Sequence, residues 1–85
     1  MATRIMLKHE IEYKLKTHIG DKMGLDADKI KIDSRYVEDL GLDSLDVIEL
    51  IMGVEDDFGI EISDEHAEKL LTFGKTVDYL VGVLG

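Results

Sequence analysis

The chain has 85 residues, no cysteine and a formal net charge of −9. This length suits one small domain with a modest core, and the lack of cysteine excludes disulfides and thiolate metal sites. The acidity argues against nucleic acid and anionic lipid as partners, because both are negatively charged. We therefore expect a single domain over residues 1–85, held together by the packing of its side chains.

The charge is distributed unevenly along the chain. Residues 1–35 hold eight basic and six acidic side chains, whereas residues 36–85 hold two basic and thirteen acidic ones. The second segment should attract basic protein surfaces over long distances. The same acidity could instead serve only solubility, and charge alone does not separate the two roles.

Targeting and membrane signals are absent from the sequence. No apolar run approaches the roughly 20 residues that a membrane-spanning helix needs. The first residues lack the apolar stretch and the small-residue cleavage site of a secretory signal. No membrane insertion and a cytoplasmic location are expected, although an organelle protein stripped of its transit peptide would have the same features.

The first predicted element is a helix from about Arg4 to Met23. Apolar residues recur along it at every fourth position: Leu7, Ile11, Leu15, Ile19 and Met23. Gly24 should cap its C-terminal end. A long polar loop follows, in which Asp33 or Ser34 could cap a short turn that carries Tyr36, Val37 and Leu40.

A second strong helix is predicted from Ser44 to Phe58, and Gly59 should end it. Its apolar stripe consists of Val47, Leu50, Ile51, Val54 and Phe58. Gly53 lies inside this helix and should cost about 1 kcal/mol relative to alanine.

Two further helices complete the predicted chain. Ser63 should cap a short helix from Asp64 to Leu71, and a last helix should run from about Lys75 to Leu84. The alternation of Ile60–Ile62 resembles a strand, but three residues without a partner strand do not form a sheet. The predicted fold class is therefore all-α: a small bundle of three long helices plus one short helix, with a long loop after the first helix.

Ser44 stands at the junction of a glycine-containing loop and an amphipathic helix. Free backbone N–H groups and the positive end of the helix dipole favour a phosphate group at such a position. A serine there is more often a plain N-cap. Position alone therefore leaves both readings open.

The residues around Ser44 resemble the attachment motif of acyl carrier proteins. The likeness is carried by the segments 37–50 (VEDLGLDSLDVIEL) and 55–62 (EDDFGIEI), and then by 64–65 and 67–69. It runs without gaps from about Ile11 to Leu80, which leaves residues 1–8 as an N-terminal extension without an assigned role.

The resemblance implies that a phosphopantetheinyl transferase attaches a 4′-phosphopantetheine arm from coenzyme A to Ser44. The thiol of the arm carries acyl groups as thioesters, so a chain without cysteine can take part in thiol chemistry. Asp43 matches an aspartate that helps to position Mg²⁺ in the transferase complex, and Mg²⁺ prefers carboxylate and phosphate oxygens. No catalytic residue and no resident metal are expected, so the protein is not an enzyme.

The second helix also carries an apolar set beside its core stripe: Leu45, Ile48 and Met52. Four carboxylates flank this set: Asp46, Glu49, Asp56 and Asp57. An apolar centre with a charged rim is typical of a protein interface. The resemblance implies that basic patches of ketoacyl synthases, reductases, dehydratases and acyltransferases dock here on a monomer. Alternatively, the apolar residues belong to the core and the acids to a solvated face.

Eight residues correspond by position to the family's acyl cavity: Tyr36, Val37, Leu50, Val54, Ile62, Ala67, Leu70 and Val77. Each could equally be an ordinary core residue, because helical bundles pack at crystal-like density. Thr76 stands where a small apolar residue is usual, which leaves the floor of that cavity open.

The resemblance favours fatty acid biosynthesis as the pathway that this carrier serves. A carrier for a specialised lipid, polyketide or aminoacyl pathway is the alternative. An unmodified acidic adaptor that only binds a partner through its second helix is a further one.

Overall fold

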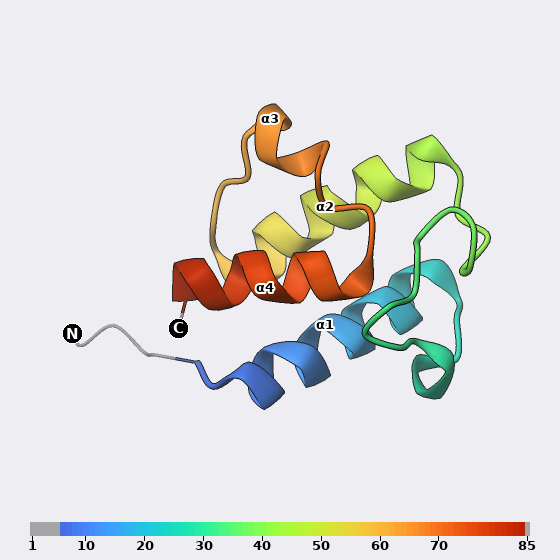
Figure 1. Ribbon diagram of the computed structural model, residues 1–85, viewed down its shortest axis with the longest axis horizontal. Coiled ribbons are helices and arrows are strands. Elements are labelled where there is room, and N and C mark those ends of the chain that lie inside the picture. The colour runs from blue at the N-terminus through green and yellow to red at the C-terminus, as the bar shows by residue number, and fades with distance from the viewer. Residues whose placement is uncertain (1–5, 85) are drawn as a thin grey trace.

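The computed structural model describes residues 6–84, and these form an all-helical bundle (Figure 1). Its elements are α1 (Lys8–Met23), the short 3₁₀ helix η1 (Ala27–Lys29), α2 (Ser44–Phe58), α3 (Asp64–Ala67) and α4 (Phe73–Leu84). The predicted fold class is confirmed, including the long loop between α1 and α2.

The core lies between α1, α2 and α4. α1 packs against both other long helices, which run in the opposite direction to it (Figure 1). The predicted stripe on α1 places Ile11, Leu15 and Ile19 at full burial. They meet a continuous set of buried apolar side chains from α2, α4 and the loops: Ile30, Tyr36, Leu42, Leu50, Ile51, Val54, Ile62, Leu70, Phe73, Val77 and Leu80.

Both predicted glycine caps are confirmed. Gly24 ends α1 and Gly59 ends α2, with left-handed φ angles of 68° and 67°. Glycine adopts this conformation without the steric cost that a side chain would add. The two caps therefore fix where each helix hands over to the following loop.

Gly53 has a packing role that the sequence analysis did not foresee. His18 of α1 is buried against α2, where a Cβ atom at Gly53 would collide with Nε2 of its ring. On the other side of the ring, Nδ1 lies 3.1 Å from an oxygen of Asp57. The glycine therefore makes room for a histidine that is held at the α1–α2 contact.

The predicted start of α1 is wrong. Arg4 lies outside the described residues, but Met6 and Leu7 are not helical, so α1 begins at Lys8. The carboxylate of Glu10 accepts a hydrogen bond from the backbone N–H of Leu7 at 2.9 Å. This contact caps the first turn from within, and Leu7 remains exposed beside it rather than in the core.

The bounds of the last two helices also differ from the prediction. Ser63 caps α3 as expected, but α3 ends at Ala67 and not at Leu71, because the chain tightens into turns that bury Leu70. α4 begins two residues early, at Phe73. Its first N–H groups donate to carbonyls of the α1–α2 loop: Phe73 to Ser34 at 2.9 Å, and Gly74 to Ile32 at 2.8 Å.

The turn within the long loop is capped by a residue that the sequence analysis did not select. Asp39 accepts a hydrogen bond from the backbone N–H of Arg35 at 2.8 Å, and both of its oxygens meet the Arg35 guanidinium at 3.0 Å. These bonds lower the pKa of Asp39 and raise that of Arg35. The predicted capping of this turn by Asp33 or Ser34 is wrong, since the Ser34 hydroxyl accepts from Lys31 instead.

Candidate functional site

Ser44 is the first residue of α2, and its side chain is exposed. Asp43, not Ser44, is the N-cap: its carboxylate accepts the N–H of Asp46 at 2.9 Å. The carboxylate of Asp46 in turn accepts the N–H of Asp43 at 3.1 Å. The two aspartates close the first turn without the Ser44 hydroxyl, which has no hydrogen-bond partner within residues 6–84 and is available for chemistry.

The loop before Ser44 sets the position of this turn. Gly41 has a φ of 72°, a left-handed conformation that turns the chain toward α2. The next residue, Leu42, is buried in the core, and its N–H donates to the carbonyl of Tyr36 at 3.0 Å. The buried Leu42 and its hydrogen bond thus fix the backbone just before Ser44, which lies at the surface.

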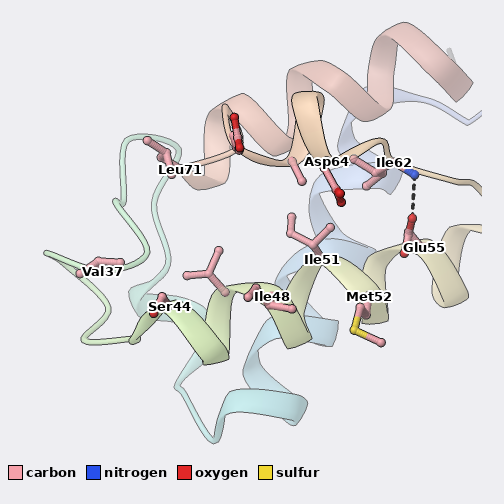
Figure 2. Close-up of a pocket in the computed structure, with 12 residues that line it drawn as sticks. Val37, Ser44, Ile48, Ile51, Met52, Glu55, Ile62, Asp64 and Leu71 are labelled. Atoms are coloured by element: carbon pink, nitrogen blue, oxygen red, sulfur yellow. Dashed lines mark hydrogen bonds between the residues drawn. The ribbon is translucent and has the colours of Figure 1, made fainter.

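An open groove of about 610 Å³ begins at Ser44 and runs between α2 and α3. In Figure 2, Ser44 stands at one end of it, Ile48 and Met52 follow along α2, and Ile62 and Asp64 face them from the other side. Its apolar lining consists of Val37, Val47, Ile48, Ile51, Met52, Ile62, Ala67 and Leu71. Three carboxylates complete the lining: Glu55, Asp64 and Glu68.

Glu55 ties the two sides of the groove together at the end away from Ser44. Its carboxylate accepts a hydrogen bond from the backbone N–H of Ile62 at 2.7 Å (Figure 2). Ser44 and Glu55 stand about 16 Å apart along α2, at about 1.5 Å of rise per residue. The groove is therefore long, apolar and bounded by a fixed polar contact.

The eight residues that were expected to line an acyl cavity fall into two groups. Val37, Ile62 and Ala67 line the groove. The other five are buried in the core and do not line it: Tyr36, Leu50, Val54, Leu70 and Val77.

A helical stripe that starts at Ser44 supplies most of the groove lining that the sequence analysis missed. Positions 44, 47, 48, 51, 52 and 55 recur at intervals of three or four residues and lie on one face of α2. The apolar pattern of the sequence places Val47 and Ile51 in the core stripe, and Ile48 and Met52 in the docking set. Counting from Ser44 would have grouped them.

The predicted docking set lies on the surface of α2. Leu45, Ile48 and Met52 are 69%, 56% and 58% exposed, so they are not core residues. Glu49 and Asp56 are exposed beside them, and Asp46 is partly exposed. Asp57 differs from the other acids, because its carboxylate is engaged with His18.

Thr76, the atypical residue of the predicted cavity floor, forms a buried hydrogen-bonded relay. The hydroxyls of Tyr36 and Thr76 lie 2.6 Å apart, and Thr76 donates to the carbonyl of Thr72 at 3.0 Å. Tyr36 must therefore be the donor to Thr76. Burial raises the pKa of Tyr36 well above its ordinary value.

Two further observations on residues 6–84 concern metal binding and membrane insertion. No group of three or more His, Asp or Glu side chains there is arranged to hold a metal ion. None of the helices in this range is long and apolar enough to cross a membrane.

Comparison with known proteins identifies the family. Residues 14–80 match the family described as "Phosphopantetheine attachment site". An acyl carrier protein of Clostridium acetobutylicum is 49% identical over 67 residues, which cover 79% of this chain and 87% of that protein. An acyl carrier protein of Akkermansia muciniphila is 44% identical over 80 residues, 94% of this chain and 100% of that protein. With its helical bundle and its free serine at the start of α2, the chain belongs to the phosphopantetheine-bearing acyl carrier protein family.

Proposed function

We propose that Ser44 bears the 4′-phosphopantetheine arm of this carrier, and that the arm presents acyl groups as thioesters to enzymes of fatty acid biosynthesis. One observation carries this assignment: the exposed Ser44 hydroxyl has no hydrogen-bond partner among the described residues and stands at the mouth of an apolar groove. The arm supplies the thiol that the chain lacks. Acyl carrier proteins are carriers and not enzymes, which supports a Ser44 that is the substrate of a transferase and not a catalytic residue.

The residues around Ser44 suit a phosphodiester. The hydroxyl lies in the first turn of α2, where the helix dipole favours negative charge. One oxygen of Asp43 is used in the helix cap, while the other has no hydrogen bond among the described residues. That second oxygen could hold the Mg²⁺ of the transferase reaction without opening the cap.

The exposed face of α2 is the proposed docking surface for the transferase and for the enzymes of acyl metabolism. Leu45, Ile48 and Met52 provide an apolar centre close to the attachment point. Glu49 and Asp56 add negative charge that would pair with Arg or Lys of the partner. Such docking should be fast at low salt and weaker when the charges are screened.

Intact-mass measurement tests the assignment of Ser44. The protein is incubated with coenzyme A, Mg²⁺ and a transferase of broad specificity, and one phosphopantetheine adduct is expected. Ser44→Ala should gain none, whereas the control Ser63→Ala, at the cap of α3, should gain one. An unchanged mass of the unaltered protein, with a transferase that modifies a known carrier, would contradict the proposal. An adduct that persists in Ser44→Ala would contradict it as well.

A further inference from the structure

At the Ser44 end of the groove, a short stretch of paired backbone separates the groove from the bundle core. Val37 and Leu71 line the groove there and are about half exposed. The backbone next to them is paired: the N–H of Tyr36 donates to the carbonyl of Leu71 at 3.1 Å, and Arg35 forms an isolated bridge with Thr72. An acyl chain that moved from the groove into the core would have to pass this paired backbone.

The hydrogen-bonded relay of Tyr36, Thr76 and Thr72 includes two residues of this paired backbone, Tyr36 and Thr72. The side chains of Tyr36 and Thr76 are fully buried, and both hydroxyl protons are used: Tyr36 donates to Thr76, and Thr76 donates to the Thr72 carbonyl. An alkyl chain that pushed the two hydroxyls apart would leave a buried phenol without an acceptor. The alkyl chain has no polar group that could replace the lost hydrogen bond. Entry of the alkyl chain between Tyr36 and Thr76 is therefore less favourable than entry into an apolar core.

The other residues expected to line an acyl cavity are closed to solvent. Leu50, Val54 and Val77 have no exposed surface, and Leu70 is 4% exposed. The groove itself is lined by residues outside this set. The groove therefore offers an acyl chain an opening at the surface, and these buried residues offer none.

We propose that the Tyr36–Thr76 hydroxyl pair determines which acyl groups this carrier shelters: it bars the cargo from the bundle core and confines it to the α2–α3 groove. The proposal rests on the proposed function, which places the arm at Ser44. Carboxylates lie at the groove's margin, with Glu55 hydrogen-bonded at the end away from Ser44. Where the arm folds back over the groove, short and medium acyl groups fit within this length, whereas the end of a long chain meets charge or water.

A series of acyl groups from butyryl to palmitoyl, loaded on Ser44 from the acyl-coenzyme A thioesters, tests this inference. The rate at which hydroxylamine cleaves the thioester, relative to the free acyl-coenzyme A, reports how far the carrier shelters the cargo. For the unaltered protein we expect shelter to rise from butyryl to octanoyl and then to change less than about twofold up to palmitoyl, because added methylene groups remain in water. In Tyr36→Phe/Thr76→Ala it should keep rising, with palmitoyl cleaved about tenfold more slowly than in the unaltered protein.

Two further variants keep the test decisive. Thr76→Ser retains the hydroxyl and should behave as the unaltered protein, while Tyr36→Phe alone removes one oxygen and should show part of the gain even if the double variant does not fold. Nuclear Overhauser contacts of the terminal methyl of an octanoyl group should reach Met52 or Ile62, and not Val54 or Val77.

The results that overturn the proposal differ from those that overturn the function. Shelter that rises steadily to palmitoyl in the unaltered protein, or equal shelter in all variants, would refute the role of the hydroxyl pair while leaving the carrier function intact. Failure of any acyl-phosphopantetheine adduct to form on Ser44 would refute the proposed attachment itself.

Discussion

The ring of His18 packs against Gly53 at the contact between α1 and α2. A glycine inside a helix normally lowers stability, and alanine at such a position usually restores about 1 kcal/mol. Here the missing Cβ is what admits the imidazole ring, which is buried and held at 3.1 Å from Asp57. The ring leaves Nε2 without a hydrogen-bond partner in the described part of the chain, so the contact is a matter of shape and not of complete polar pairing.

Gly53→Ala should therefore destabilise the protein by about 1–3 kcal/mol, the usual range for overpacking a filled contact. Urea unfolding followed by circular dichroism gives the change in the free energy of unfolding. Adding His18→Ala to Gly53→Ala should recover much of the stability that Gly53→Ala loses. His18→Ala removes the imidazole ring that the new Cβ would meet.

Gly82 offers a matched control for this pair. It also lies inside a helix, α4, but a Cβ there would meet no atom within 4 Å. Gly82→Ala should leave stability unchanged or raise it by up to about 1 kcal/mol. If Gly53→Ala stabilised the protein as much as Gly82→Ala does, the collision with His18 would be refuted.

At the scale of the elements, α2 could be predicted from the sequence at both ends, whereas α3 could be predicted only at its start and α4 only at its end. Local signals bound α2: an aspartate cap pair at its start and a left-handed glycine at its end. The start of α4 depends on carbonyls of Ile32 and Ser34, some 40 residues earlier in the chain, and no local pattern encodes that contact. The early end of α3 likewise follows from the burial of Leu70 against the rest of the bundle.

The candidate site was predictable to a similar extent. The motif around Ser44 indicated the position, and helical periodicity indicated the exposed set on α2. The sequence did not reveal that Tyr36, Leu50, Val54, Leu70 and Val77 would be buried in the core and take no part in the groove lining. That outcome depends on how closely side chains from three helices pack, which periodicity does not report.

The first turn of α2 allows two roles of Asp43 to be separated. Asp43→Ala removes the cap and should cost about 1 kcal/mol of stability, whereas Asp43→Ser keeps a capping oxygen and should cost less than half of that. Both variants lack the carboxylate proposed to bind Mg²⁺, so both should be modified more slowly by the transferase.

Thermal unfolding and the rate of adduct formation, measured on the same samples, distinguish the two roles. Slow modification of both variants, with a stability loss mainly in Asp43→Ala, is the expected pattern. Modification of Asp43→Ser at the rate of the unaltered protein would show that the aspartate acts only as a cap.

For the whole molecule, the dominant physical feature is an excess of negative charge. Residues 36–85 hold thirteen acidic and two basic side chains, and many of the acids lie on α2 and around α3. In the described acidic segment, residues 36–84, the ion pairs of acidic side chains are Asp39 with Arg35, and Asp57 with His18 if that histidine is protonated. Most of the acidic side chains therefore repel one another across the folded surface.

Salt should raise the melting temperature, because counterions screen this repulsion more effectively in the compact state, where the charges are close. Calorimetry at low and high sodium chloride measures the effect, and potassium chloride serves as a control for ion identity. Asp56→Asn, which removes one exposed charge from α2, should raise the melting temperature at low salt and reduce its dependence on salt. A melting temperature that does not change with ionic strength would contradict this account.

The division of duties between Asp43 and Ser44 has a consequence for recognition. The aspartates complete the first turn of α2, so the serine oxygen has no structural duty that modification could disturb. An arm added there, or removed again, would leave the helix and its surface as they were. A partner could not then distinguish the unmodified protein from the phosphopantetheinylated protein by the shape of α2. It would have to touch the arm itself, and the unmodified protein would compete for the same docking surfaces.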